Sequence, residues 1–546
     1  MAKRLFLSTL VSCLFLLRWT DATKPNIVFI MGDDLGWNDV GFHNSKVKSP
    51  NIDALKEAGI RLTSNYAAPV CSASRSALMT GKDPHHNGFQ HMVFAVQAPS
   101  CLPLEHTLLP KYMKNEGYVT KMLGKWHLGY CAEECLPTNR GWDEFRGILG
   151  GESDYYNWEE EHVMLKYVND TVKMPPTTHP VHLSVQDKED VVEMISDHAG
   201  NSDPLFLFVS PNAPHSPMEV TPEMYEVNSD LNLDPRDPDQ NKRRKYLGLV
   251  YALDEIVGAT VQALKDADML DNTVIVFQSD NGGSNIGGGY GECYGNNYPL
   301  RNGKASPYEG GVKVPSIYYD PRLSESTHGT DRDFLMHITD WLPTFLELAG
   351  GTTPTGIDGL SQISNLGETY DSSNKYTVRD RFLVSLDTIS QNKAIYRCTD
   401  RDGAYRYKDW KLVYGKKSTW TEDENSPDTY RKPEESPELE TLTGDSCVIG
   451  EGVDQQIRCL FNIENDPSEQ HNLYNSEPDM VEQLLAMLND EKTTIVREVY
   501  TDTEPISEEN TINKDGIYVP RIPFCNIDSF PLQDNYEGCD RRHDEL

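Results

Sequence analysis

Four oxygen-bearing side chains stand at the ends of two short apolar runs in this 546-residue chain. Asp33 and Asp34 follow the run that begins NIVFI at 26–30, and Asp280 and Asn281 follow TVIVFQS at 273–279. Three carboxylates and one amide oxygen suit Ca²⁺ or Mg²⁺, whereas zinc prefers nitrogen or sulfur ligands. Either pair alone is typical of a turn. Two such pairs, each at the end of a buried strand, favour a metal site.

Cationic side chains elsewhere indicate what such a metal would act on. Lys125 and His127 in MLGKWHLGY are two residues apart, so on a strand both would address one ligand from the same face. His215 lies in NAPHSPM, just past an apolar run, and Lys304 lies in the loop YPLRNGKASPYEGGV. Each alone is typical of a solvated or structural residue. Several cations near a divalent metal predict an oxyanion substrate that carries phosphate or sulfate.

Cys71 stands in PVCSASRSALMTGK, where small and polar residues surround it and Arg75 follows close to one helical turn later. The segment itself leaves three interpretations open: a structural thiol, half of a disulfide, or a residue that performs chemistry. Of the 11 cysteines, Cys13 leaves with the predicted N-terminal signal. With Cys71 set aside the remainder is odd, so at least one is free or bonded between chains. The remaining cysteines are Cys101, Cys131, Cys135, Cys293, Cys398, Cys447, Cys459, Cys525 and Cys539.

The elements that must position these residues alternate along the chain. Continuous apolar runs at 26–30, 204–210 and 273–279 predict strands buried on both faces. Apolar spacings of three and four predict helices at 51–60, 108–118 and 246–270. This alternation predicts an α/β fold whose large, mixed, mostly parallel sheet is sandwiched by helices. Ligands of such folds bind beyond the carboxyl ends of the strands, where the polar residues above converge.

The pattern of predicted strands and helices changes near residue 385. Residues 394–417 read as a strand-turn hairpin, 460–475 as a turn leading to a helix, and 478–494 as that helix. We therefore predict a smaller C-terminal α+β domain at 389–500 after a catalytic domain at 23–388. Residues 415–455 read as an acidic, Pro-rich loop, and an acidic tail occupies 501–546.

Charge and targeting signals limit the partners. The formal charge of −35 disfavours nucleic acid and anionic membranes. Residues 1–22 have the basic start and apolar run of a secretory signal peptide, and no later run approaches 18 apolar residues, so we expect no membrane span.

The chain ends in HDEL at 543–546, which predicts retention in the lumen of the endoplasmic reticulum by the retrieval receptor, with secretion or a lysosomal location as second choices. Asn169-Asp170-Thr171 is an N-glycosylation sequon.

Several longer motifs together resemble the type I sulfatase family of the alkaline phosphatase superfamily, and within it the subgroup of arylsulfatase B and its close relatives. They are GDDLGWNDVGFH, CSASRSALMTG, GKWHLG, ECLPTNRGWDEF, DNGG and PLRNGKASPYEGGV. The match runs over about residues 25–350, with a weaker C-terminal match through DWKLVYG and LFNIENDPSEQHNL. The resemblance implies the alkaline phosphatase-like fold and hydrolysis of sulfate esters, such as those of sulfated sugars or glycosaminoglycan-like glycans.

The resemblance also implies roles for individual residues. A formylglycine-generating enzyme would oxidise Cys71 to Cα-formylglycine, whose hydrate is the nucleophile and a ligand of one Ca²⁺ per chain. The other calcium ligands would be Asp33, Asp34, Asp280 and Asn281. Arg75 would orient the hydrate, His127 supported by Lys125 would act as base, and His215 and Lys304 would grip sulfate and assist the leaving oxygen. Cys101 would pair with Cys135.

Two departures and two alternatives accompany this resemblance. Ala73 stands where most eukaryotic members have Pro, and Lys82 stands where Arg is usual. One alternative is a phosphate mono- or diester hydrolase of the same superfamily. The other is an inactive, glycan-binding protein of the endoplasmic reticulum in which Cys71 stays unmodified.

Overall fold

The computed structural model describes residues 24–90, 93–94, 98, 100–156, 164–168, 171–173, 181–231, 233–284, 293–387, 402–416, 445–449, 456–496 and 499. The signal peptide predicted at 1–22, the Asn and Asp of the sequon at 169–170, and the tail at 501–546 with its HDEL ending lie outside these residues. The same holds for Cys398, Cys525 and Cys539 and for most of the loop predicted at 415–455.

A large sheet forms the centre of the molecule. Its strand order is β11 (Thr330–Arg332), β2 (Ile60–Leu62), β10 (Ser316–Tyr319), β9 (Thr273–Ser279), β1 (Asn26–Gly32), β8 (Leu205–Ser210), β4 (Val119–Gly124), β5 (Glu144–Ile148), β6 (Met164–Val168) and β7 (Thr171–Lys173). The five central strands, from β9 to β5, are parallel, and β10 and β6 run antiparallel beside them. The predicted mixed, mostly parallel sheet is confirmed.

The continuous apolar runs are explained by burial on both faces of this sheet. Every residue of β1 is buried. Ile27 and Phe29 belong to one core, while Val28 and Ile30 belong to the other, because successive side chains of a strand point to opposite faces. A strand covered on both faces has no solvent side on which polar residues would be favourable.

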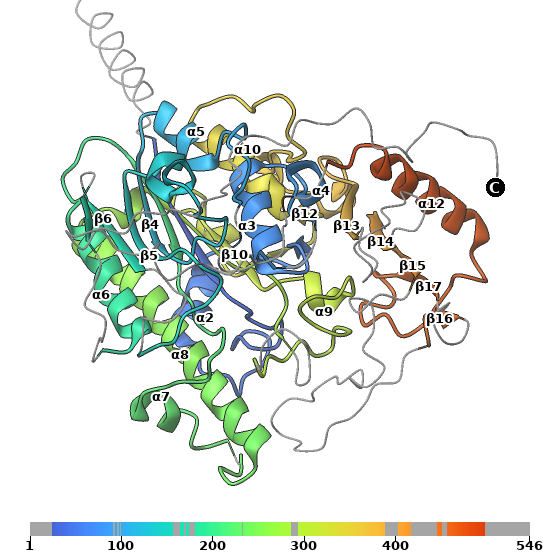
Figure 1. The fold of residues 1–546 in the computed structure, drawn as a ribbon, viewed down its shortest axis with the longest axis horizontal. Helices are drawn as coiled ribbons and strands as arrows, with labels where there is room; N and C mark the ends of the chain where they lie inside the picture. Colours follow the sequence, from blue (N-terminus) through green and yellow to red (C-terminus); the bar gives the residue numbers. More distant parts are fainter. Residues whose placement is uncertain are drawn as a thin grey trace, which may run out of the picture.

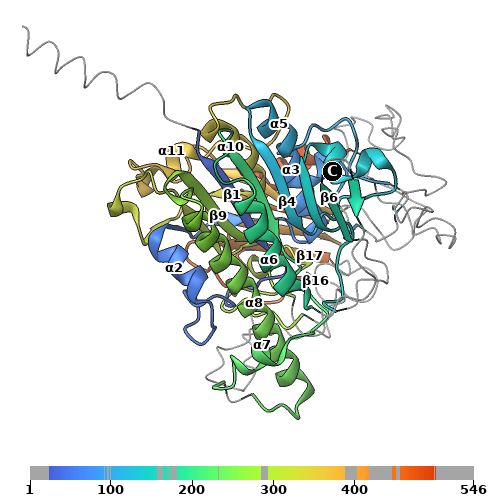
Figure 2. The ribbon, with the colours of Figure 1, turned by 90° about the vertical axis from the view of Figure 1, so that its left-hand side faces the viewer.

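Helices cover both faces of the sheet, as predicted. One face packs against α2 (Pro50–Ala58), α6 (Leu183–Ser196) and α8 (Pro238–Asp266), which lie in front in Figure 2. The other packs against α3 (Cys71–Thr80), α5 (Leu109–Asn115) and α10 (Trp341–Leu348). The shorter helices are α4 (Pro84–Asn87), α7 (Pro222–Glu226), α9 (Glu309–Val312) and α11 (Ile363–Leu366), and the 3-10 turns are η1 (Glu133–Cys135), η2 (Pro137–Arg140), η3 (Leu270–Asn272), η4 (Glu325–Thr327), η5 (Ile338–Asp340) and η6 (Ser372–Asn374).

Helix α8 differs in its bounds from the predicted helix at 246–270. It begins at Pro238, because the Asp237 side chain accepts hydrogen bonds from the first backbone amides and Pro suits the first helical position. Its length and composition are also sufficient to cross a membrane. However, 67% of its most apolar stretch is buried within the protein, as in the core helix of a soluble protein.

The C-terminal region forms a second, antiparallel sheet in the order β13 (Arg381–Asp387), β14 (Asp402–Tyr407), β15 (Trp410–Lys416), β17 (Gln456–Asn462) and β16 (Val448–Ile449). Strands β14 and β15 form a hairpin within the one predicted at 394–417, whose residues 394–401 and 417 lie outside the described residues. The expectation of a turn from residue 460 was wrong at its start, since Leu460 and Phe461 are strand residues buried in two different cores.

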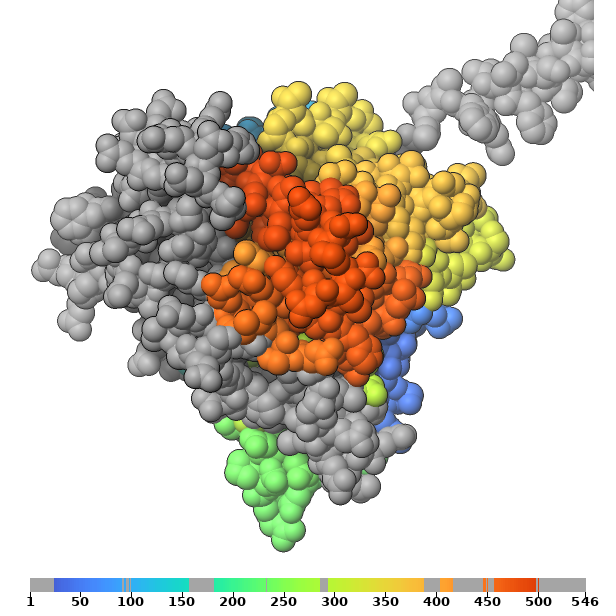
Figure 3. Space-filling model, turned by 90° about the vertical axis from the view of Figure 1, so that its right-hand side faces the viewer, coloured from blue at the N-terminus to red at the C-terminus, as the bar shows by residue number. Residues whose placement is uncertain are grey.

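This smaller sheet lies between the large domain and α12 (Pro478–Lys492), as Figure 1 shows. One face of the sheet packs Leu412 and Leu460 against Leu484 of α12. The other face packs Val413 and Phe461, among others, against aromatic residues of the large domain. In Figure 3 the orange and red C-terminal residues form the middle of the surface on this side. A short two-stranded ribbon in the large domain pairs β3 (Asn65–Tyr66) with β12 (Met336–His337).

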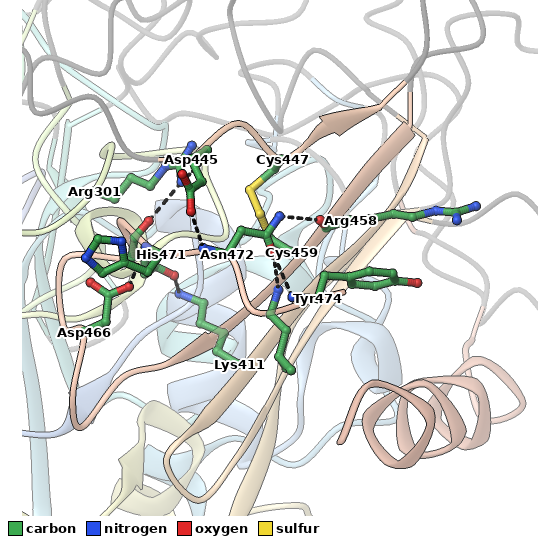
Figure 4. Close-up of a disulfide and its surroundings, with 12 residues drawn as sticks. Arg301, Lys411, Asp445, Cys447, Arg458, Cys459, Asp466, His471, Asn472 and Tyr474 are labelled. Carbon is green, nitrogen blue, oxygen red and sulfur yellow. Dashed lines mark hydrogen bonds and ion pairs between the residues drawn. A yellow bond between two sulfur atoms is a disulfide. The ribbon is translucent and has the colours of Figure 1, made fainter. Parts of the chain in front are cut away.

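Two disulfides have both partners among the described residues. Cys101 pairs with Cys135, which confirms the pairing that the resemblance implied. Cys447 pairs with Cys459 and ties the chain before β16 to β17, beside Asn472 in Figure 4. Cys131 is also disulfide-bonded. Cys71 and Cys293 are the free, buried cysteines of the described chain.

Candidate active site

Helix α3 places Cys71 at its first residue, in the interior of the protein. All ten residues of α3 are buried, and Cys71 is 1% exposed. Small side chains make such close packing of a helix start feasible. Burial raises the pKa of the Cys71 thiol, an effect that nearby Lys125 and Lys304 only partly oppose. As a thiol, Cys71 is therefore a poor nucleophile at neutral pH.

Arg75 lies one turn further along α3 and joins this helix to the ends of three strands. Its Nε and Nη2 donate to Asp280 Oδ2 at 3.2 and 2.8 Å. Its Nη1 donates to the backbone oxygen of Lys125 at 2.9 Å and to Ser210 Oγ at 2.5 Å. The guanidinium thus joins α3 to residues at the ends of β9, β4 and β8.

The four oxygen-bearing residues meet because β1 and β9 are parallel neighbours that end level with each other. The Asp34 amide donates to Asp280 Oδ1 at 3.2 Å, and Asn281 Nδ2 donates to Asp34 Oδ1 at 2.7 Å. Asp33 Oδ1 and Asn281 Oδ1 are buried and have no hydrogen-bond partner. Buried acceptors without donors are unfavourable unless a ligand completes them. The donor set, all oxygen, therefore fits a hard cation.

Opposing effects set the charge of these acids. Burial alone raises the pKa of Asp33, but the surrounding cations, led by Lys125, lower it below its ordinary value. Burial likewise raises the pKa of Asp34, and Lys304 and other groups lower it overall. For Asp280, burial and the charge of Asp33 prevail, and the pKa is raised. Asp33 and Asp34 therefore remain anionic at neutral pH.

Lys125 and His127 reach the site by a different route from the predicted one. Strand β4 ends at Gly124, so neither residue lies on a strand, and His127 has a φ of 56°. The turn nevertheless brings both inward: Lys125 Nζ donates to Asp33 Oδ2 at 2.6 Å, and His127 Nδ1 lies 3.3 Å from Cys71 Sγ. The expected shared strand face was wrong, although both side chains reach the same site.

The hydrogen bonds of His127 indicate its tautomer. Its Nε2 lies 2.8 Å from the backbone oxygen of Phe94, which can only accept, so Nε2 carries the proton. The lone pair of Nδ1 then faces Cys71. Burial, followed by the charge of Lys125, lowers the pKa of His127 well below its ordinary value. The neutral ring is a proton acceptor directed at Cys71.

His215 and Lys304 approach from the opposite side. Lys304 Nζ lies 2.7 Å from Asp34 Oδ1 and 3.3 Å from His215 Nε2. His215 Nδ1 donates to the backbone oxygen of Ser216 at 2.9 Å. Burial lowers the pKa of Lys304, but Asp34 and further anionic neighbours raise it overall. Lys304 is therefore a fixed positive charge.

Three further residues belong to this site that sequence reasoning did not single out. Ser210 binds Arg75, Glu152 Oε2 lies 3.7 Å from His215 Nδ1, and Cys293 Sγ accepts a hydrogen bond from the Ser216 amide at 3.1 Å. Ser210 is the last residue of a strand at the same sheet edge, and that position was a usable signal. The other two come from loops with no readable pattern.

The structure thus brings together every residue of the predicted site. Its three buried carboxylates face three cationic side chains, so a divalent cation would leave the site with excess positive charge. Such a site favours an anionic substrate and stabilises charge that develops on a leaving oxygen.

Comparisons with known proteins agree with this chemistry. The sulfatase family model matches residues 25–351. Arylsulfatase J of Mus musculus is 31% identical over 513 residues, which cover 89% of this chain and 78% of that protein. N-acetylgalactosamine-6-sulfatase of Homo sapiens is 29% identical over 395 residues, covering 68% and 71%. The crystal structure of Ps i-CgsB in complex with k-i-k-neocarrahexaose is similar with a TM-score of 0.69 and 27% identity, covering 88% of this chain and 95% of that one.

Proposed function

The chain belongs to the sulfatase family and is a sulfuric ester hydrolase, and from this premise we propose that it hydrolyses sulfate esters of sugars with a formylglycine at position 71 and one Ca²⁺. The observation that carries the proposal is the placement of His127 Nδ1 at 3.3 Å from Cys71 Sγ, beside buried oxygens that lack donors. The sugar part of the substrate is supported by the amino-sugar and carrageenan-type names of the relatives.

The residues that would hold Ca²⁺ are Asp33, Asp34, Asp280 and Asn281, joined by the side chain at position 71. Asp33 Oδ1 and Asn281 Oδ1, which have no partner, are the open acceptors. The ion would supply Lewis acidity and positive charge near the reacting oxygens. Carboxylate and amide oxygens without nitrogen favour Ca²⁺ over zinc.

Conversion of Cys71 by a formylglycine-generating enzyme gives this position its nucleophile. The raised pKa of the thiol leaves little thiolate at neutral pH, whereas a hydrated aldehyde presents two hydroxyl groups. Ala73 lies inside the recognised motif, in the first turn of α3, where Pro would also be tolerated.

The side chains of the protein would carry out proton transfer, position the calcium ligands and bind the sulfate group. His127 accepts a proton at Nδ1 from the hydroxyl at position 71, which lets the sulfated side chain collapse and release sulfate. Lys125 and Arg75 hold Asp33 and Asp280 in place. Lys304 and His215, 3.3 Å apart, bind the sulfate oxygens and protonate the leaving alcohol.

We also propose that the protein resides in the lumen of the endoplasmic reticulum, as its signal peptide and HDEL ending predict. Removal of residues 543–546 should send the protein into the medium of cultured cells, because the retrieval receptor no longer binds it. Equal retention of the full and shortened chains would contradict the proposal.

The proposed chemistry is tested on protein that has been expressed through the secretory pathway of cultured cells and then purified. Mass spectrometry of the tryptic peptide that contains Cys71 should show formylglycine, and an aryl sulfate should be turned over much faster than the matching aryl phosphate. Cys71→Ala should lose essentially all turnover. An unmodified thiol in all of the material would support the glycan-binding alternative, and faster phosphate turnover would support the phosphatase alternative.

A further inference from the structure

Three side chains with metal-ligating atoms meet outside the active site, where the large domain faces the end of α12. His85 and His86 lie on α4, and Glu491 lies near the C-terminus of α12. One ligand atom from each lies within 4.8 Å of the others. The two histidine rings lie close together, with centroids 3.8 Å apart and their planes tilted by 38°. Residues about 400 positions apart in the sequence therefore form one cluster.

His85 is the member whose surroundings call for a ligand. It is 1% exposed, and neither ring nitrogen has a hydrogen-bond partner. A buried imidazole without hydrogen-bond partners is unfavourable. Its Nε2 lies 3.4 Å from Glu491 Oε2, long for a hydrogen bond. Two ligands on a tetrahedral zinc ion, with bonds of about 2.0–2.1 Å, are about 3.3 Å apart.

His86 has the supporting hydrogen bond that metal-bound histidines usually have. Its Nδ1 lies 2.8 Å from Asp358 Oδ2, so Nδ1 carries a proton, and in the neutral ring the lone pair is on Nε2. Carboxylate-histidine-metal arrangements fix the ring in this way. Nε2 lies 2.8 Å from Thr494 Oγ1, an exposed hydroxyl that a metal ion would displace.

The electrostatic surroundings favour a cation. Besides Glu491, the carboxylate of Asp358 acts on both histidines. Asp83 lies beside His86, but burial and the charge of Asp358 raise its pKa to about 8, so it adds little negative charge at neutral pH. Tyr405 donates to Glu491 Oε1 at 3.2 Å, which leaves Oε2 directed at His85. The positive charge of Arg379 also lies near Asp83, but the guanidinium of Arg379 donates a hydrogen bond of 2.6 Å to Asp340. Its charge is therefore used mainly by Asp340. The side chains of His86 and Glu491 are 22% and 27% exposed, so an ion has access from solvent.

We propose that His85, His86 and Glu491 bind one divalent transition-metal ion, preferably Zn²⁺, in a site separate from the oxygen-only cluster. Two imidazole nitrogens and one carboxylate suit Zn²⁺ and disfavour Ca²⁺. The fourth position is left for water. The ion fastens α12 to α4, the helix that directly follows α3, where the Val496 amide already donates to the His85 backbone oxygen at 2.9 Å.

The test uses the full chain, freed of transition metals and kept in millimolar Ca²⁺ so that the oxygen cluster is occupied. Zn²⁺ is titrated by calorimetry, and Co²⁺ is added separately to read the coordination from its visible spectrum. We expect one Zn²⁺ per chain, a higher unfolding temperature with Zn²⁺, and the intense absorption of four- or five-coordinate Co²⁺. Glu491→Gln and His86→Ala should each bind Zn²⁺ at least about 100-fold more weakly and lose the thermal shift.

The matched control is His471→Gln, an exposed histidine in the same domain as α12, which should bind Zn²⁺ as the unmodified chain does. Glu491→Gln keeps the shape of the side chain, and its aryl sulfatase activity in Ca²⁺ reports that it is folded. Equal Zn²⁺ affinity in the unmodified chain and Glu491→Gln would overturn the proposal. So would an octahedral Co²⁺ spectrum, or no Zn²⁺ binding below about 100 μM.

Discussion

Two buried clusters of charged residues, one in the active site and one between the domains, differ in whether their side-chain oxygens have partners within the chain. In the interdomain cluster, Lys411 Nζ lies 3.0 Å from Glu309 Oε1 and 2.8 Å from Glu469 Oε1. The second oxygen of Glu309 accepts from the Tyr66 hydroxyl at 2.8 Å, and that of Glu469 accepts from the Glu309 amide at 2.7 Å. Every carboxylate oxygen of this cluster has a hydrogen-bond or ion-pair partner within the chain, and that of Glu469 Oε1 is the ion pair with Lys411 alone.

The active-site cluster is equally buried but remains open. Asp33 Oδ1 and Asn281 Oδ1 have no donor, although both residues are fully buried. Charged groups whose partners all lie within the chain leave no acceptor for a ligand, whereas charged groups with unused acceptors can bind one. The interdomain cluster therefore holds the two domains together, whereas the active-site cluster is available for ligand binding and catalysis.

A backbone hydrogen bond between two glycines connects the chain segments that follow the two clusters. The Gly282 amide donates to the Gly311 backbone oxygen at 2.9 Å. A Cβ on Gly282 would lie 1.7 Å from the Gly310 oxygen, so only glycine fits there. The backbone that follows Glu309 thus supports the backbone that follows Asn281.

Asp280→Asn should break the open cluster and have the largest effect. It removes a charge that Arg75 and the proposed Ca²⁺ both use, so aryl sulfate turnover should fall by about 10³-fold. Steady-state kinetics and Ca²⁺ titration measure the effect, and Asp271→Asn, at an exposed position, is the matched control. Near-normal turnover with near-normal Ca²⁺ affinity would remove Asp280 from the site.

Lys411→Met should break the closed cluster and act on stability instead. It leaves two buried carboxylates without their cation, so the free energy of unfolding should fall by about 3–5 kcal/mol. Urea unfolding followed by tryptophan fluorescence measures it. Lys408→Met, at the exposed turn of the same hairpin, should change little. If Lys411→Met lost turnover but not stability, the distinction between the clusters would fail.

The pH dependence of stability sharpens the comparison. Burial, which Lys411 only partly opposes, raises the pKa of Glu469 from 4.5 to about 7. The folded chain then holds a proton that the unfolded chain has lost, so this contribution to stability is present below about pH 4.5 and is lost as pH rises towards 7. Glu309 and Arg301, whose Nη1 donates to the Glu469 backbone oxygen at 3.0 Å, also face this group.

Glu469→Gln mimics the protonated form at every pH. Its unfolding temperature relative to the unmodified chain should therefore rise between pH 5 and pH 8, by the equivalent of at most about 3 kcal/mol. Thermal unfolding across this pH range measures the difference. A constant difference would show that Glu469 does not titrate in this range.

Ser210→Ala should have the smallest effect. It removes one uncharged acceptor of Arg75 and leaves the Asp280 carboxylate in place, so turnover should fall about fivefold, the equivalent of one hydrogen bond of about 1 kcal/mol. Ser196→Ala, on the exposed face of α6, serves as the control. A loss as large as that of Asp280→Asn would mean that hydroxyl and carboxylate matter equally.

The sequence predicted those parts that depend on local pattern. Apolar runs located β1, β8 and β9, and the polar residues behind them met at one sheet edge because parallel strands end together. The position of His127 was predicted for the wrong reason, since its φ of 56° is set by the fold around it. The interdomain cluster had no signal, because Glu309 and Lys411 lie far apart and periodicity does not encode which distant charges pair.

The burial of Cys71 has a consequence for the order of events during synthesis. Lys304, the last of the proposed catalytic residues, leaves the ribosome roughly 230 residues after Cys71, which takes about 10–50 seconds at 5–20 residues per second. Until then the walls around this 1% exposed side chain are not all present. Under the proposed function, timing rather than an opening in the finished protein would give a modifying enzyme its access to the thiol. A chain that folded before modification would keep Cys71 as a buried thiol with a raised pKa, which is a poor nucleophile at neutral pH.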